Sequence, residues 1–175
     1  LRIAGVPIGE EITDLASCTA ASTLPSMRDG ERAPPLCRAG AVRDDSEPDR
    51  ELGSIIAVVA TDAPLLPHQL KRIATRVSLG LGRVGSYASN GSGDIFIAFS
   101  TANANTAMAG DSAQLTMLSN ARISSLFLAT VQATEEAIVN AMLASDTMTG
   151  ADNFRVYGLP ASRVMDALRK YGRLK

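Results

Sequence analysis

The chain has 175 residues, enough for one domain with a core of ordinary size, and 46% of them are apolar. It carries 17 Lys and Arg against 18 Asp and Glu, and the net charge of −1 argues against a nucleic-acid partner held by bulk electrostatics. No stretch approaches the roughly 18 consecutive apolar residues of a membrane span, and no secretory signal is visible. We therefore expect no nucleic-acid or membrane partner, and a cytoplasmic location is favoured although the compartment is not fixed.

The first part of the chain gives few signals of regular structure. Leu1 to Val6 is predicted to be the end of a strand, followed by a turn rich in glycine and proline. From Thr13 to Leu52 no helical or strand period is sustained, and loops longer than about 12–15 residues are unusual inside a compact domain. We therefore expect a mobile linker over residues 13–53. Chains tolerate cleavage in segments of this kind.

The only two cysteines, Cys18 and Cys37, lie in this first part. Their spacing matches no metal-binding motif, and one pair gives no disulfide framework. We expect two free thiols, with a local disulfide as the alternative.

A strand, a helix and a second strand are predicted next. The apolar run from Ser54 to Ala60 is typical of a strand buried on both faces. Pro67 fits the first turn of a helix that runs to Leu81 and is ended by the glycines at 80, 82 and 85. Asn90-Gly91 predicts a tight turn, and Asp94 to Thr101 a second strand.

The rest of the chain is predicted to be mainly helical. A loop from Asn103 leads to a long helix over Arg122 to Ser145, then a short strand within Phe154 to Tyr157 and a last helix after Pro160. The pattern is that of an α/β chain with few strands of its own. We expect partner strands to come from a segment outside these residues.

Gly53-Ser54 is a candidate self-cleavage site. A serine at the head of a buried strand, preceded by glycine and a linker, can attack the peptide bond before it. Cleavage leaves an α-amine of pKa about 7.7–8.0 beside the hydroxyl, which is a usable general base. Because Gly-Ser is a common dipeptide, spacing alone does not establish this.

Ser92 and Asp94 lie two residues apart at the start of the second predicted strand, so their side chains share a face. A carboxylate and a hydroxyl placed this way can orient a nucleophile on a neighbouring strand. The alternative is that both residues only complete the Asn-Gly turn.

The single histidine, His68, falls in the first turn of a predicted helix with no serine, cysteine or acid at a telling spacing. We expect it on the surface, which argues against a serine–histidine–aspartate triad. The ligands of a zinc hydrolase are also lacking. A hydrolase of this sequence needs another base, for which the amine of Ser54 is the candidate, and no metal or organic cofactor is called for.

Whole segments of the chain resemble the β-aminopeptidases, the L-aminopeptidase/D-amidase-esterase family. The match runs from Gly53 to Asn103, GSIIAVVATDAPLLPHQLKRIATRVSLGLGRVGSYASNGSGDIFIAFSTAN, and continues through Ala133 to Leu143, ATEEAIVNAML. In that family a precursor cuts itself before a serine and the two pieces form one enzyme. The resemblance implies an αββα four-layer sandwich, a fold shared with the ornithine acetyltransferases.

The resemblance also assigns roles to residues. It implies that Ser54 is the nucleophile, exposed by cleavage after Gly53, and that Ser92 and Asp94 are the supporting hydroxyl and acid. Some members carry glutamate where this chain has Asp94, and the shorter side chain alters the relay geometry. The implied substrates are short peptides and amino-acid amides or esters.

The resemblance places this chain in the C-terminal portion of the precursor. Residues 1–12 resemble the tail of the larger subunit, and residues 54–175 correspond to the smaller, catalytic one. The larger subunit of the family supplies strands, pocket walls and an asparagine for the oxyanion hole, whose donors are worth about 2.7–4 kcal/mol each. A homo-oligomer of such subunit pairs is also implied, and we expect the chain alone to have negligible activity.

Two other functions stay open. One is acyl transfer of the ornithine acetyltransferase type, whose threonine nucleophile Ser54 does not match. The other is a truncated, non-catalytic remnant that only packs against a partner.

Overall fold

The computed structural model describes residues 1–19, 53–104, 106 and 110–174. The chain divides into two compact units. The first combines Leu1–Pro48 with Ile138–Lys175, and the second is Asp49–Ala137. Two distant stretches of the sequence thus build the first unit, whereas the second is continuous.

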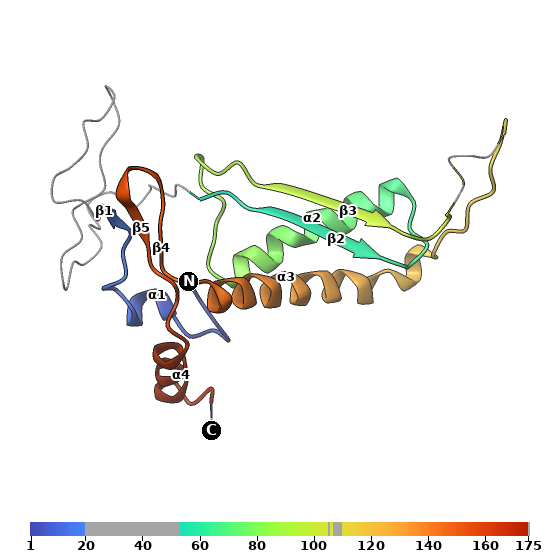
Figure 1. Ribbon diagram of the computed structural model, residues 1–175. Helices are drawn as coiled ribbons and strands as arrows, with labels where there is room; N and C mark the ends of the chain where they lie inside the picture. The colour runs from blue at the N-terminus through green and yellow to red at the C-terminus, as the bar shows by residue number, and fades with distance from the viewer. Residues whose placement is uncertain (20–52, 105, 107–109, 175) are drawn as a thin grey trace. The chain divides into compact units, whose positions relative to one another are not determined.

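The second unit contains a parallel pair of strands joined by a helix. β2 (Ile56–Thr61) pairs with β3 (Ile95–Ser100) in parallel, with Ile56 opposite Ile95. The connection between them contains α2 (Pro67–Arg83), as parallel pairing requires a crossover. Both strands and the helix were predicted from sequence, and their existence is confirmed (Figure 1).

The start of α2 follows from its sequence, and its end follows from one of the three glycines that were predicted to end it. Pro67 occupies the first turn, where the missing N–H costs nothing, and the buried Gln69 accepts the Leu66 N–H at 3.2 Å. At the other end the helix runs through Gly80 and Gly82 to Arg83. Of the three glycines predicted to end the helix, Gly80 and Gly82 therefore lie within it, whereas Gly85, with φ +100°, directly follows the C-cap residue Val84.

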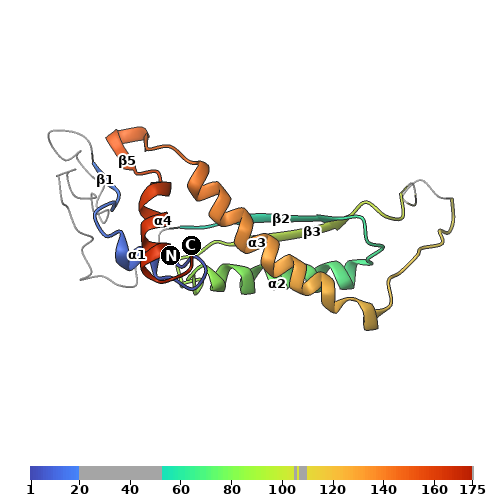
Figure 2. The same cartoon turned by 90° about the horizontal axis from the view of Figure 1, so that it is seen from below.

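One face of the strand pair is covered by helices. Ile73 of α2 and Ile123, just before α3 (Ser124–Ala144), are 2% and 1% exposed and pack with Val59 and Ala98 from the strands. Figure 2 shows α2 and α3 beside β2 and β3. Burial of these aliphatic side chains is the main stabilising contribution to this unit.

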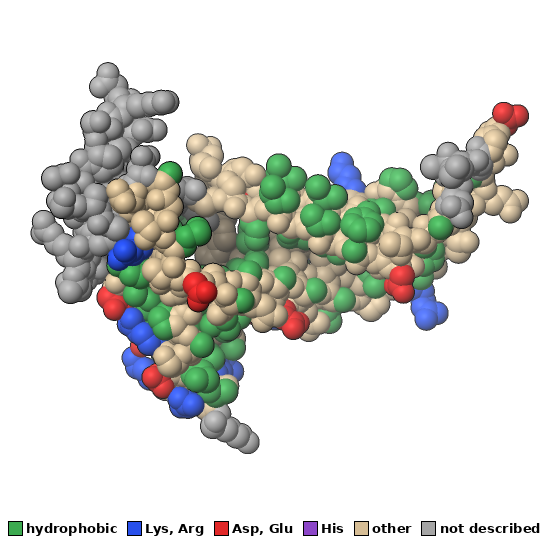
Figure 3. All heavy atoms as spheres, viewed as in Figure 1, with side chains coloured by type: hydrophobic (Ala, Val, Ile, Leu, Met, Phe, Trp, Pro, Cys, Tyr) green, Lys and Arg blue, Asp and Glu red, His purple; other side chains and the backbone are tan. Residues whose placement is uncertain are grey.

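The opposite face of β2 and β3 is apolar and exposed. Alternate residues of both strands point to it, with exposed fractions from 44% for Phe99 to 69% for Ile56. Figure 3 shows hydrophobic side chains along these strands. The described residues leave this face exposed, so burial of the first strand on both faces, as predicted, would need the partner strands expected from outside these residues. The face consists of Ile56, Val58, Ile95, Ile97 and Phe99.

Gly80 sets how closely α2 approaches α3. A Cβ added there would lie 2.6 Å from the Thr134 Cβ and 2.8 Å from the Val131 carbonyl oxygen, so the helix backbones would have to separate. Nothing lies within 4 Å of a Cβ added at Gly82, two residues later. The two glycines therefore differ in packing, although they share one helix.

We expect Gly80→Ala to lower the free energy of unfolding by about 1–3 kcal/mol through overpacking. Gly82→Ala is the matched control and should raise it by about 0.5–1 kcal/mol, since alanine is the better helix former. Chemical denaturation of both variants measures the difference. A Gly80→Ala variant as stable as Gly82→Ala would contradict the close contact.

The first unit joins both ends of the sequence. Its strands are β1 (Cys18–Thr19), β4 (Met148–Thr149) and β5 (Phe154–Val156), in the order β1-β5-β4 with antiparallel pairing. Its helices are α1 (Ile8–Glu11) and α4 (Ala161–Lys170). The predicted last helix and short strand are confirmed, whereas β4 was not predicted.

The strand predicted over Leu1 to Val6 is not formed. Ile3 and Val6 exchange two backbone hydrogen bonds, at 3.1 and 2.9 Å, across a turn that includes Gly5 with φ +81°. The chain therefore folds back on itself before it can extend.

Cys18 is disulfide-bonded, and its sulfur lies 3.6 Å from the Tyr157 hydroxyl. The free-thiol prediction is wrong for this residue, and the local disulfide was the alternative. Cys37 lies outside the described residues, as does most of the predicted linker over residues 13–53. No described helix is both long and apolar enough to cross a membrane.

Candidate active site

The predicted site residues lie where β2 and β3 begin. Ser54 precedes β2 by two residues, and Asp94 directly precedes β3. The parallel register continues before the strands, since the Ile95 N–H donates to the Ile55 carbonyl at 2.9 Å. This pairing brings residues 54 and 93 together, although 39 positions separate them in sequence.

The Ser54 hydroxyl is exposed and held from one side by a backbone amide. The Gly93 N–H donates to the Ser54 Oγ at 2.9 Å. A Cβ added at Gly93 would lie 3.3 Å from the same oxygen, a tight contact. Glycine thus lets the backbone approach the serine hydroxyl closely, and a hydrogen bond of this kind also favours the ionised oxygen.

Asp94 anchors the residue that follows Ser54. Its Oδ1 accepts the Ile55 N–H at 3.0 Å, and the carboxylate is half-buried. Its Oδ2 is buried and finds no hydrogen-bond partner within the described part of the chain. One oxygen of the carboxylate therefore fixes the backbone beside the candidate nucleophile, and the other is able to accept a further hydrogen bond.

Ser92 belongs to the turn before β3. Its N–H donates to the Ser89 carbonyl at 2.9 Å, which closes the tight turn predicted at Asn90-Gly91. Among the residues that the structure describes, its half-buried hydroxyl makes no hydrogen bond to Ser54 or Asp94. A relay through Ser92 stays a prediction.

The candidate side chains were indicated by the sequence, whereas two backbone donors were not. The amides of Gly93 and Ile55 make the contacts to the Ser54 hydroxyl and the Asp94 carboxylate. The signal for Gly93 was present, because a glycine between two candidate residues allows close approach of the backbone. Gly53 lies exposed, directly before Ser54.

The described residues offer neither a buried histidine nor a cluster of metal ligands. His68, the only histidine of the sequence, is exposed in the first turn of α2, as predicted. Within the described ranges no group of three or more His, Cys, Asp and Glu residues could hold a metal ion. In the intact chain the Ser54 nitrogen is an amide, which is not a base.

An exposed serine at the start of a strand of an α/β unit, directly after glycine, is the arrangement of a candidate N-terminal-nucleophile hydrolase. Comparison with known proteins agrees with this class. The chain belongs to peptidase family S58, whose family model matches residues 1–156.

Relatives with names or structures are similar over nearly the whole chain. The chain is 45% identical to a β-peptidyl aminopeptidase, BapA, from Sphingosinicella microcystinivorans, covering 99% of this chain and 40% of that protein. It is 40% identical to the PH0078 protein of Pyrococcus horikoshii OT3, with a TM-score of 0.73 over 99% of this chain and 39% of the other.

A second solved structure connects the family to a fold. The L-aminopeptidase D-Ala-esterase/amidase of Ochrobactrum anthropi matches with 38% identity and a TM-score of 0.71, over 100% of this chain and 40% of that one. It is described as a prototype for the serine aminopeptidases and a variant of the Ntn-hydrolase fold. The chain thus spans about 40% of the length of such relatives.

Proposed function

We propose that this chain is the catalytic portion of a serine aminopeptidase or amidase that generates its own N-terminal nucleophile at Ser54. The observation that carries the proposal is the exposed Ser54 hydroxyl, 2.9 Å from the Gly93 amide, in a chain of peptidase family S58. The proposed substrates are short peptides, amides or esters with a free amine. The names of the β-peptidyl aminopeptidase and the L-aminopeptidase relatives support this class.

Self-cleavage begins with attack of the Ser54 Oγ on the Gly53 carbonyl carbon. An ester bond to the serine oxygen forms, the Gly53–Ser54 amide bond breaks, and the proton passes to the released nitrogen. Water then hydrolyses the ester and leaves a Gly53 carboxylate and a free Ser54 with amine and hydroxyl together. The Gly93 N–H, already directed at this oxygen, would favour its deprotonated form before the attack.

The mature reaction repeats this chemistry on a substrate. The Ser54 amine accepts the hydroxyl proton as the oxygen attacks the substrate carbonyl, then protonates the leaving group. Water next hydrolyses the acyl-enzyme, with the same amine as base. No metal or organic cofactor takes part in any step of this proposal.

The remaining site residues act by positioning. Asp94 holds the Ile55 amide through Oδ1, which fixes the backbone just after the nucleophile. We propose that its buried second oxygen and the Ser92 hydroxyl form hydrogen bonds with the ammonium and the hydroxyl of the cleaved Ser54. A carboxylate there would hold the amine in place between proton transfers.

The exposed strand face supports a second part of the proposal. A four-layer αββα sandwich needs another sheet against β2 and β3, and their free side is apolar. We propose that a larger subunit supplies this sheet, the pocket walls and the oxyanion asparagine, and that subunit pairs form a homo-oligomer. The 40% coverage of the aminopeptidase relatives leaves room for such a subunit.

Activity assays of the full-length gene product test the reaction class. We expect hydrolysis of aminoacyl p-nitroanilides and β-alanyl dipeptides, and no acetyl transfer from acetylornithine. Acetyl transfer without amide hydrolysis would indicate an ornithine acetyltransferase instead. Turnover of neither substrate class would favour the non-catalytic remnant.

A further inference from the structure

The proposed cut between Gly53 and Ser54 separates residues 1–19, in the sequence, from the elements that they contact. They belong to the same compact unit as Ile138–Lys175, and Ser54 lies between these two stretches in the sequence. Cleavage after Gly53 would therefore turn contacts within one chain into contacts between two polypeptides.

The contact has an apolar centre. Val6 and Ile8 are 1% and 0% exposed, and they form one cluster with Val164 and Ala167 of α4. A cluster this deeply buried stabilises the association of the two segments, because it removes apolar surface from water. The partly buried residues packed around it come from both sides of the cut as well: Leu1, Ile3, Ile12, Leu159 and Leu168.

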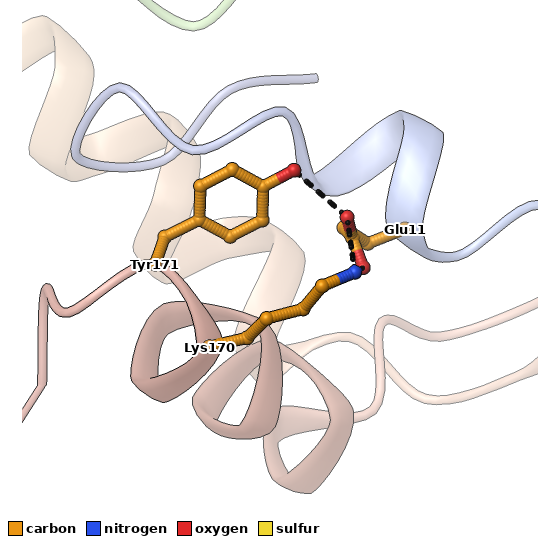
Figure 4. Close-up of polar contacts among 3 residues, drawn as sticks. All are labelled: Glu11, Lys170 and Tyr171. Atoms are coloured by element: carbon orange, nitrogen blue, oxygen red, sulfur yellow. Dashed lines mark hydrogen bonds and ion pairs between the residues drawn. The ribbon is translucent and has the colours of Figure 1, made fainter.

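Charged groups of opposite sign surround this centre. Lys170 donates to both carboxylate oxygens of Glu11, at 3.0 and 2.8 Å, and the Tyr171 hydroxyl donates to one of them at 2.9 Å (Figure 4). Arg163 holds Asp14 through two hydrogen bonds, at 2.9 and 2.7 Å. The acids belong to the first segment and the bases to α4.

These hydrogen bonds keep the acids charged. The bond from Lys170, with that from Tyr171, lowers the pKa of Glu11, and the bond from Arg163 lowers the pKa of Asp14. Both carboxylates therefore carry their charge at neutral pH, where the bases are protonated. Exposed pairs add little free energy, so they serve mainly to select the register of contact.

Backbone pairing extends the contact beyond the helix. β1 pairs with β5 in antiparallel fashion, with Cys18 opposite Arg155 and Thr19 opposite Phe154. Both cysteines of the sequence precede Ser54, so an intrachain disulfide would not link the two products of cleavage. Noncovalent contacts alone would hold this segment in place.

We propose that residues 1–19 are a docking segment that keeps the end region of the N-terminal cleavage product bound to α4 and β5 of the C-terminal product. This inference rests on the proposed self-cleavage. The partner of the α4 surface is thus a defined peptide of the same precursor, recognised by two buried aliphatic side chains and two carboxylates.

Hydrogen–deuterium exchange of the full-length gene product, before and after cleavage, tests the docking. A parallel sample carries Ser54→Ala and a site-specific protease sequence inserted before residue 54, so that the cut does not depend on self-processing. We expect exchange in α1 and α4 to change less than about twofold on either cut. Exchange at unfolded-chain rates in residues 6–14 after the engineered cut would overturn the inference.

Neighbouring residues of α4 provide matched variants. Val164 is 3% exposed and belongs to the apolar cluster, whereas Met165 is 41% exposed. After the cut, Val164→Asp should release the segment and Met165→Asp should not. Equal exchange in the two variants would contradict the proposed contact.

Swapping the charges of the Lys170–Glu11 ion pair provides a second test in case Val164→Asp does not fold. Lys170→Glu should speed exchange of residues 8–12 in the cut protein by roughly two- to fivefold, the range of an exposed ion pair. Adding Glu11→Lys should restore slow exchange, and failure of this rescue counts against the pairing. A wild type that stays whole while the engineered cut leaves the segment docked would refute self-cleavage alone.

Discussion

Ser54→Ala is expected to leave the full-length precursor as one polypeptide with no detectable hydrolase activity. The variant removes the oxygen that attacks Gly53 and, without cleavage, the amine that serves as base. Loss of a serine nucleophile in other hydrolases lowers kcat by about 10⁶-fold. Denaturing gel electrophoresis should show two bands for the wild type, and the N-terminal sequence of the smaller should read Ser-Ile-Ile-Ala.

A control separates this effect from misfolding. Ser54 is exposed and its hydroxyl accepts a hydrogen bond from the Gly93 amide, so its loss should leave the thermal transition nearly unchanged. Ser78→Ala changes an exposed serine of α2 and should be cleaved and active like the wild type. A wild-type chain that stays whole yet turns over substrate would sink the mechanism, because an acylated nitrogen is not a base.

The elements of the second unit were predictable because their signals are local. The apolar run before residue 61 and the Pro67 helix start depend on neighbouring residues, and both strands were predicted within two residues of their ends. Glycine alone did not show which of three predicted positions ends α2, and the structure places that end just before Gly85. Gly80 instead allows α3 to approach α2 closely. That contact involves Val131 and Thr134, which lie about fifty residues away in the sequence.

The first unit was harder to predict because its contacts join the two ends of the sequence. β1 and β4 are two-residue strands, too short to carry a period, and β1 is defined by β5. The ion pair of Glu11 with Lys170 leaves no local pattern either. Residues 13–19 were predicted to be linker because they carry no strand period, whereas the strand partner of Cys18 is Arg155, far away in the sequence.

The sequence indicated which residues could form the candidate site but not which of their atoms are in contact. Asp94 directly precedes β3 and Ser92 lies in the turn before it, close to the strand start that their sequence pattern indicated. Which atoms meet depends on the parallel register, and that register directs the Gly93 amide at the Ser54 hydroxyl. Backbone donors carry no residue-type signal, so side-chain motifs overlook them.

The strand face of the second unit leads to the other prediction with a large expected effect. Residues 1–175 produced alone should associate or aggregate and show negligible activity, because large exposed apolar patches are interfaces or aggregation hazards. Paired strand residues Val58 and Ile97 are 59% and 48% exposed at the centre of this face. In the complete enzyme we propose that the second sheet covers them.

Substitution of that pair tests the cause of association. Val58→Thr with Ile97→Thr keeps the strand preference of both positions but makes the face less apolar, so size-exclusion chromatography should show less association. Leu79→Gln is the matched control: Leu79 is also 59% exposed but lies on α2, so the oligomer should persist. In the full-length protein the double variant should weaken subunit assembly. A wild-type fragment that elutes as a monomer with one sharp thermal transition would refute this account, since the exposed strand face would then need no partner.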